Sequence, residues 1–206
     1  MKTKREMLLS SLSRSRNMLI LASESPRRRE LLGTLGIPFE IRSAEVEELE
    51  QAEDACSVSL LPQKNACLKA QAVAELYPES VVLGADTAIG FENQLIGKPR
   101  DLEDARRILE MFSGKTHQVI TGIALMRAGE KPFCRQWSEI SEVTFKPLSC
   151  EIIDEYLKKV HVLDKAGAYA IQECGDMIIS GFTGELNNII GLPLLRLEEE
   201  LKKILL

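Results

Sequence analysis

A strand, a short loop and a helix start follow one another near the beginning of the chain, and this unit constrains the fold most. Met18 to Ala22 (MLILA) is a continuous apolar run, typical of a buried strand. Ser25 is a good N-cap and Pro26 fits the first helical position, so a helix is predicted over Arg27 to Leu35. This succession favours an α/β fold.

The rest of the chain continues this alternation of strand and helix patterns. Further strands are predicted at Phe39–Ser43, Ser80–Leu83, Gln118–Arg127 and Ile140–Phe145. Further helices are predicted at Pro62–Leu76, Asp101–Phe112, Ser149–Val160 and Pro193–Leu205, with Asp101 and Ser149 as N-caps. Residues 87–96 suggest a hairpin with its turn at Glu92 and Asn93. Since hairpins and crossovers both occur, we expect a mixed central sheet flanked by helices.

The size and charge of the chain fit a globular enzyme. Its 206 residues lie within the range of one domain, and its net charge of −5 with 45% apolar residues gives no sign of a nucleic-acid surface. A nucleotide partner would therefore be a small one. No apolar stretch is long enough to span a bilayer, so no membrane association is expected.

The cysteines and the N-terminal residues give indications of the cellular compartment. Five scattered cysteines without a C-x-x-C pair indicate reduced thiols in the cytosol. Residues 1–17 are basic and contain serine, and we interpret them as a flexible extension before a domain spanning 18–206. An organelle-targeting segment is the alternative for this extension.

Three consecutive arginines open the predicted helix that follows Ser23–Pro26. The helix dipole disfavours cations in the first turn, whereas helix N-termini readily bind anions. The small and hydroxyl residues of this loop, followed by Arg27 and Arg28, have the form of a phosphate cradle. A run of solvated charges explains the arginines equally well from this segment alone.

Other motifs are chemically suggestive, and each also fits a structural role. Asp86 and Thr87 follow the strand predicted to stop at Gly84, on the side of an open α/β sheet where ligands bind. A carboxylate there could bind Mg²⁺ or accept a proton from water, or cap a turn. Lys98 and the acidic stretch around Glu48 could belong to a functional site, or they could simply be solvated surface charges. The SGKTH segment is not a P-loop, because Leu109 stands where a glycine is required.

The segment LDKAGAYAIQ places small residues before Gln172. The amide of Gln172 carries a donor and an acceptor and can pair with the imide edge of uracil or thymine. A tight bend beside a strand is the structural alternative.

Together these segments resemble the Maf family of nucleoside triphosphate pyrophosphatases, which are associated with septum formation. The resemblance runs in order and spacing from about residue 18 to the C-terminus. The matching segments are Ser23–Arg28 with Glu30–Leu32, Lys69–Ala70, Gly84–Thr87, Gly97–Pro99, Ser113–His117, Asp164–Tyr169, Ile171–Gln172 and Gly191–Leu194. Single motifs are weak, but eight in register are specific.

The resemblance implies an elongated, two-lobed α/β domain with a cleft, cytoplasmic, often dimeric, and dependent on a divalent cation, Mg²⁺ or Mn²⁺. It implies hydrolysis of dTTP and UTP to the monophosphate and pyrophosphate. The implied catalytic residues are Asp86 as general base, Lys69, Lys98 and Glu48, with Glu48 and Asp86 at the metal. Ser23, Arg27 and Arg28 would hold the phosphates, and Arg27, Thr87 and Gln172 would select the base.

The sequence leaves some of these points open. Glu24 adds a negative charge to the phosphate loop and could weaken binding if it turns inward. Either Glu47 or Glu48 could face the metal. Two other functions remain open: a nucleotide-binding regulator of cell division with incidental hydrolysis, and a pyrophosphatase that removes non-canonical purine triphosphates.

Overall fold

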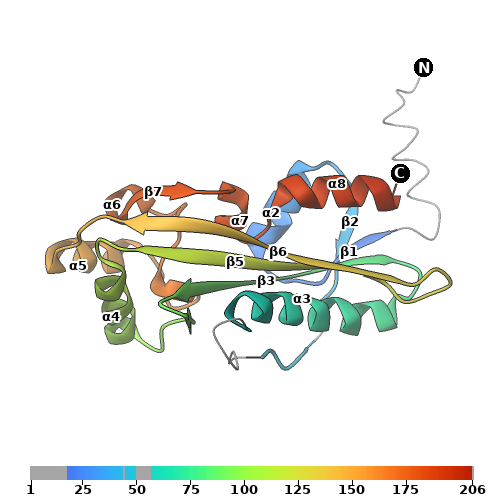
Figure 1. Cartoon of the computed structure of the whole chain (residues 1–206), viewed down its shortest axis with the longest axis horizontal. Helices are drawn as coiled ribbons and strands as arrows, with labels where there is room; N and C mark the ends of the chain where they lie inside the picture. The colour runs from blue at the N-terminus through green and yellow to red at the C-terminus, as the bar shows by residue number, and fades with distance from the viewer. Residues whose placement is uncertain (1–17, 44, 50–56, 206) are drawn as a thin grey trace, which may run out of the picture.

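The computed structural model describes residues 18–43, 45–49 and 57–205, and the predicted extension 1–17 lies outside them. Within the described residues the strands form one seven-stranded mixed sheet in the order β2-β1-β3-β5-β6-β7, with β4 beside β3 (Figure 1). The strands are β1 (Leu19–Leu21), β2 (Phe39–Ile41), β3 (Val81–Phe91), β4 (Gln94–Ile96), β5 (Thr116–Arg127), β6 (Phe133–Phe145) and β7 (Ile179–Thr183). The helices are α2 (Pro26–Thr34), α3 (Ser57–Leu76), α4 (Leu102–Phe112), α5 (Cys150–Lys159), α6 (Gly175–Ile178), α7 (Leu186–Ile190) and α8 (Leu194–Leu205), with a 3-10 turn at Ala166–Ala168.

The expected mixed sheet flanked by helices is confirmed. Strand β1 runs parallel to β2 and β3, while the pairs β3–β4, β3–β5, β5–β6 and β6–β7 are antiparallel. Helix α3 covers one face of the sheet, and α2 and α8 cover the other face at the same end (Figure 1). The predicted hairpin is present, and Glu92 and Asn93 at its turn both have positive φ.

The predicted helix caps are also confirmed. The side chains of Ser25, Asp101 and Ser149 accept hydrogen bonds from the backbone N–H groups of Arg28, Asp104 and Ile152. Such caps satisfy N–H groups that the helix itself leaves unpaired. These helix starts could be predicted because they depend on residues three apart in the sequence.

The prediction that a strand stops at Gly84 is wrong. Strand β3 continues through Gly84 to Phe91, so Asp86 and Thr87 lie in the middle of a strand rather than after its end. Gly84 is needed for close packing: a Cβ built on it would lie 2.1 Å from the Ala66 carbonyl oxygen in α3. The glycine therefore lets a helix lie against the sheet, and it does not end the strand.

Two further boundaries differ from the prediction by more than two residues. Helix α3 begins at Ser57 and contains Pro62, where the prediction began at Pro62. Strand β6 begins at Phe133 instead of Ile140, because its polar, exposed residues still pair with β5, as Arg135 does with Leu125. Tertiary pairing overrides the local pattern there.

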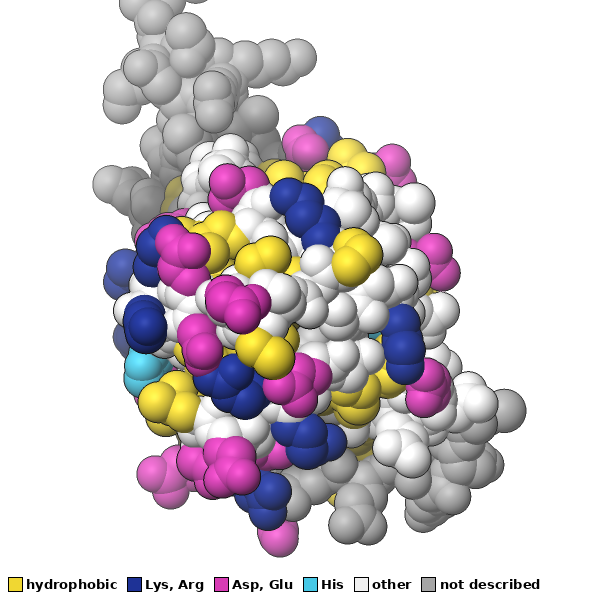
Figure 2. Space-filling view, turned by 90° about the vertical axis from the view of Figure 1, so that its left-hand side faces the viewer, with side chains coloured by type: hydrophobic (Ala, Val, Ile, Leu, Met, Phe, Trp, Pro, Cys, Tyr) yellow, Lys and Arg dark blue, Asp and Glu magenta, His cyan; other side chains and the backbone are white. Residues whose placement is uncertain are grey.

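Within residues 18–43, 45–49 and 57–205 the core consists of three apolar clusters. One lies between α3 and the sheet and includes Ala66, Ala70 and Val82. The opposite face carries two clusters, one with α2 and α8 and one with α4 and α5, at the two ends of the long strands. Figure 2 views the end with α5, where acidic and basic side chains are interspersed, the pattern of a solvated surface. No helix in the described part of the chain is long and apolar enough to cross a membrane.

His117 is buried in the cluster near α4. Its ring stacks on Phe112 at 4.3 Å between ring centroids, and its Nε2 lies 2.8 Å from the Tyr169 hydroxyl. Its Nδ1 has no hydrogen-bond partner in the described structure. Burial therefore lowers the pKa of His117 to about 4, because the charged ring would be poorly solvated.

We expect this histidine to make folding stability depend on pH. Between pH 6.5 and 4 the unfolded chain binds a proton that the folded chain does not, so the free energy of unfolding falls by about 3 kcal/mol as the pH drops. Urea unfolding of the wild-type chain and of His117→Phe, across this range, measures the effect. The variant should lose this part of the pH dependence. If its free energy of unfolding changed with pH as much as that of the wild type, His117 would not be the source.

Candidate active site

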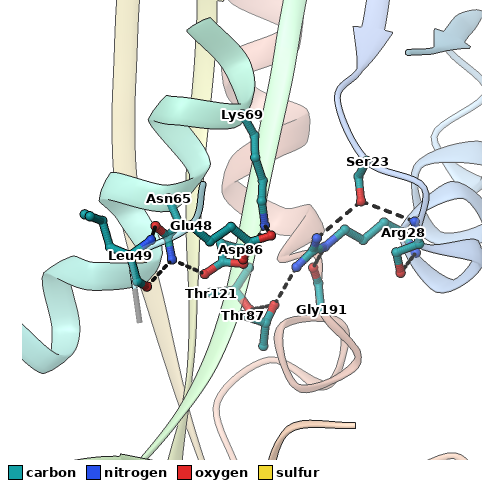
Figure 3. Close-up of polar contacts among 11 residues, drawn as sticks. Ser23, Arg28, Glu48, Leu49, Asn65, Lys69, Asp86, Thr87, Thr121 and Gly191 are labelled. Carbon is teal, nitrogen blue, oxygen red and sulfur yellow. Dashed lines mark hydrogen bonds and ion pairs between the residues drawn. The ribbon is translucent and has the colours of Figure 1, made fainter. Parts of the chain in front are cut away.

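The site is built at an unpaired stretch of the β3 edge. Strand β1 pairs with Val81–Leu83 and β4 pairs with Ile89–Phe91, so among the described residues no strand borders Gly84–Ala88 on that side. Successive side chains of a strand point to opposite faces. Asp86 contacts α3 residues on one face, whereas Thr87 contacts Arg28 and Thr121 on the other face (Figure 3).

The acidic half of the site is organised around Lys69 of α3. The Lys69 ammonium lies 2.8 Å from Asp86 Oδ1 and 3.0 Å from Glu48 Oε1. The lysine and the aspartate are largely buried, with side chains 14% exposed, and Glu48 is half exposed. The structure thus brings together three predicted catalytic residues, and Glu48 rather than Glu47 makes the contact.

Asn65 is a site residue that the sequence analysis missed. It lies one helical turn before Lys69 and is 3% exposed. Its Oδ1 accepts from the Leu49 N–H (2.8 Å), and its Nδ2 donates to the Leu49 carbonyl (3.0 Å) and to Asp86 Oδ2 (3.2 Å). Asn65 therefore fixes both the segment that carries Glu48 and the carboxylate of Asp86. The available signal was a polar amide on the alanine-rich face of a predicted helix.

The basic half of the site is the guanidinium of Arg28 (Figure 3). Its Nε donates to the Gly191 carbonyl (3.0 Å), Nη1 to Ser23 Oγ (3.3 Å) and Nη2 to Thr87 Oγ1 (3.1 Å). Burial lowers the pKa of Arg28, while the charges of Asp86 and Glu48 raise it. Arginine remains protonated in proteins. All three hydrogen-bond acceptors are neutral, and no ion pair to Arg28 is present within the described residues.

The phosphate loop itself is compatible with an anion. Ser23 is buried, and its hydroxyl also accepts from the backbone N–H of Ser25 at 3.3 Å. Glu24, which could have opposed binding, is exposed and accepts a hydrogen bond from the Ser43 hydroxyl at 2.7 Å. The Glu24 carboxylate is thus hydrogen-bonded to Ser43.

The structure does not join three of the predicted residues to this network. Arg27 is half-buried in the first turn of α2, Lys98 is exposed after β4, and Gln172 is exposed in the turn before α6. None has a hydrogen bond or ion pair to the Asp86 or Arg28 groups among the described residues. Lys98 follows Gly97, whose carbonyl accepts from the Gly167 N–H at 3.0 Å, so its segment borders the one that leads to Gln172.

The acidic residues suit a hard divalent cation. Glu48 and Asp86 share one ammonium, so their carboxylates approach the same place. No cluster of three or more His, Cys, Asp or Glu side chains that could hold a metal occurs in the described part of the chain. Mg²⁺ typically uses one or two protein carboxylates and completes its shell with substrate phosphates and water. The donor set therefore fits Mg²⁺ or Mn²⁺ bound together with a polyphosphate.

Comparison with known proteins identifies the family. Residues 18–204 match the sequence pattern described as Maf-like protein. The chain belongs to the Maf family. This match includes every predicted site residue.

Relatives in the family are similar over most of their length. The chain is 46% identical over 180 residues to the dTTP/UTP pyrophosphatase of Akkermansia muciniphila, covering 85% of this chain and 90% of the relative. It is 44% identical over 184 residues to the enzyme of the same name from Bacillus cytotoxicus, covering 89% and 94%.

A solved structure shares the fold of this Maf-family chain. The Staphylococcus aureus Ham1 protein superposes with a TM-score of 0.50 over 90% of this chain and 98% of that chain, at 13% identity. At this identity the likeness concerns the fold alone.

Proposed function

We propose that this chain is a nucleoside triphosphate pyrophosphatase that hydrolyses dTTP and UTP to the monophosphate and pyrophosphate. The observation that carries the proposal is the placement of an aspartate held by Lys69 and Asn65 beside an arginine that has no carboxylate partner in the described structure. The relatives named dTTP/UTP pyrophosphatase, alike over 85–90% of this chain, support the substrate class.

Arg28 is suited to hold the polyphosphate. A guanidinium has five N–H groups in a planar fork, and three are used among the described residues, which leaves two for a ligand. Two parallel N–H donors match the geometry of a phosphate group. In the proposal Ser23 and Arg27 add contacts from the same loop and helix start, and Lys98 adds positive charge from the segment after β4.

Asp86 is suited to activate water. In the proposed reaction, water attacks the α-phosphorus and gives its proton to Asp86, and the bond from the α-phosphorus to the oxygen bridging to the β-phosphorus breaks. Pyrophosphate leaves with the bonding electrons. Lys69 and Asn65 hold one oxygen of Asp86 each, so the carboxylate keeps a fixed direction during this transfer. A cation held by Glu48 and Asp86 would neutralise charge on the phosphates.

A nucleotide panel tests the function. The purified chain is incubated with Mg²⁺ or Mn²⁺ and dTTP, UTP, dCTP, GTP or ITP, and released pyrophosphate and orthophosphate are assayed separately. We expect pyrophosphate from dTTP and UTP. Orthophosphate alone, or no hydrolysis at all, would contradict the proposal, and preferential hydrolysis of ITP would favour a purine-directed enzyme.

In the proposal Gln172 selects the base together with Arg27 and Thr87. Its exposed amide can donate to a carbonyl and accept from the imide N–H of uracil or thymine. We expect Gln172→Leu to lower kcat/KM for dTTP and UTP by about tenfold relative to other nucleotides, the value of one hydrogen bond pair. Competition between UTP and CTP measures this ratio. Equal losses for every base would exclude this role.

The proposal extends to a cytoplasmic homodimer, which is supported by the family resemblance. Sedimentation equilibrium of the full chain measures the mass of the particle in solution. A monomer at micromolar concentration would contradict the dimer without affecting the proposed reaction.

A further inference from the structure

A chain of hydrogen bonds runs from Arg28 through two threonines to α7, and Figure 3 shows its first two links. Arg28 Nη2 donates to Thr87 Oγ1 (3.1 Å), which lies 3.0 Å from Thr121 Oγ1 on β5. Thr121 Oγ1 in turn donates to the Asn188 carbonyl at 3.1 Å. Thr121 and Asn188 are fully buried. Neither was identified from the sequence.

The protons of this chain have one consistent direction. A hydroxyl has a single proton to donate. Thr121 gives its proton to the Asn188 carbonyl, so Thr87 is the donor in the contact between the two threonines. Thr87 therefore presents a lone pair to Arg28. Aligned hydrogen bonds strengthen one another, and here the cation stands at their donor end.

The end of the chain is firmly held. The Asn188 amide donates to the Val119 carbonyl (3.1 Å) and to Ser141 Oγ (3.0 Å), which fixes α7 against β5 and β6. Gly191, just after α7, has φ of +124° and supplies the carbonyl that accepts from Arg28 Nε. Two backbone carbonyls from one short segment thus fix two different nitrogens of Arg28, one directly and one through the threonines.

The two threonines occupy a place where apolar residues would otherwise be expected. On β5, Val119 belongs to the apolar cluster of α4 and Ile123 to that of α8, and Thr121 lies between them on the same face. On β3, Thr87 lies in the same way between Ala85 and Ile89. Two facing hydroxyls at this boundary require partners, and they connect the interior of the sheet to Arg28.

We propose that Thr121, acting through Thr87, is a positioning residue that aims the two remaining N–H groups of Arg28 at the polyphosphate. This inference rests on the proposed function. It gives Thr87 a role beside the proposed base selection, because its proton is used on Thr121 and one of its two lone pairs on Arg28. Loss of the Thr121 hydroxyl should then weaken the binding of every nucleoside triphosphate by the same factor.

Thr121→Val tests the inference, because valine has the same shape and lacks the hydroxyl. We expect KM for dTTP and UTP to rise by about tenfold with kcat within about twofold, the net value of about one hydrogen bond between neutral groups. Affinity for tripolyphosphate, which has no base, should fall by the same factor in calorimetric titration. Thr121→Ser, which keeps the hydroxyl, should restore both values.

The matched control is Thr116→Val on the same strand. Thr116 also faces a threonine across the sheet, Thr144 at 2.9 Å, but it is exposed and outside the site. It should leave KM and tripolyphosphate binding unchanged. If Thr121→Val fails to fold, Thr87→Val, at a less buried position, should weaken tripolyphosphate in the same way. Where both fold, the double variant should be no worse than either single one.

Two results would overturn the inference. Unchanged tripolyphosphate affinity in a folded Thr121→Val would show that Arg28 does not need the hydrogen-bond chain through Thr87 and Thr121. A rise in KM for dTTP without weaker tripolyphosphate binding would place the effect at the base. Tripolyphosphate binding requires no hydrolysis, so a wild-type chain that binds it and hydrolyses no nucleotide would contradict only the proposed function.

Discussion

Asp86→Asn should reduce the rate of pyrophosphate release from dTTP by about a thousandfold, within the range for loss of a general base. Asparagine has nearly the same shape and can keep the Lys69 contact through its carbonyl oxygen. Its NH2 group then faces the Asn65 NH2 group, so that hydrogen bond is lost, and the amide cannot accept the proton of water. Asp86 is partly exposed, and its hydrogen bonds are to the polar side chains of Lys69 and Asn65 rather than to the apolar core. The fold should therefore persist in the variant. Initial rates with Mg²⁺, together with circular dichroism and thermal unfolding, measure both expectations.

Asp104→Asn provides the matched control for Asp86. Asp104 is a buried carboxylate of α4 that forms ion pairs with Arg100 and Arg107. Its hydrogen bond from Arg107 is the main cause that lowers the pKa of Asp104 to about 2. Its replacement should lower stability and leave the rate per folded molecule unchanged. If Asp86→Asn keeps a rate within tenfold of the wild type, another group activates the water.

Features that depend on near neighbours in the sequence were predictable. The caps at Ser25, Asp101 and Ser149 and the hairpin turn at Glu92 and Asn93 were all found as expected. Helix capping and tight turns are determined by the conformations of a few adjacent residues. The roles of Asp86, Lys69 and Glu48, in contrast, came from the family resemblance, and the residues alone left structural alternatives open.

Features that depend on distant contacts were not predictable. Asn65 contacts Leu49 and Asp86, and Thr121 contacts Thr87 and the Asn188 carbonyl, 67 positions away. A polar residue within an apolar strand or helix gives no indication of its partner. The error at Gly84 has the same origin: whether a glycine ends a strand or admits a helix depends on what packs over it.

The second large effect is expected from Gly122→Ala on β5. Gly122 is paired with Asp86 across the sheet and lies under α3. A Cβ at this position would lie 2.2 Å from the Gln63 backbone nitrogen and 2.4 Å from the Pro62 carbonyl oxygen. These are backbone atoms within a helix, so the helix as a whole must move. We expect the free energy of unfolding to fall by about 3 kcal/mol, the upper range for overpacking.

This displacement should also reduce catalysis in the molecules that remain folded. Asn65 and Lys69 lie on the same helix, one and two turns beyond the contact with Gly122, and both bind Asp86. A shift of an ångström in such groups can reduce a rate by about a hundredfold. Gly181→Ala in β7 is the control, because a Cβ there meets nothing within 4 Å. Urea unfolding and initial rates on both variants separate the two effects. If Gly122→Ala kept the wild-type rate, the position of α3 on the sheet would not determine the geometry of Asp86; if it kept the wild-type unfolding midpoint, the helix would have room that the structure does not show.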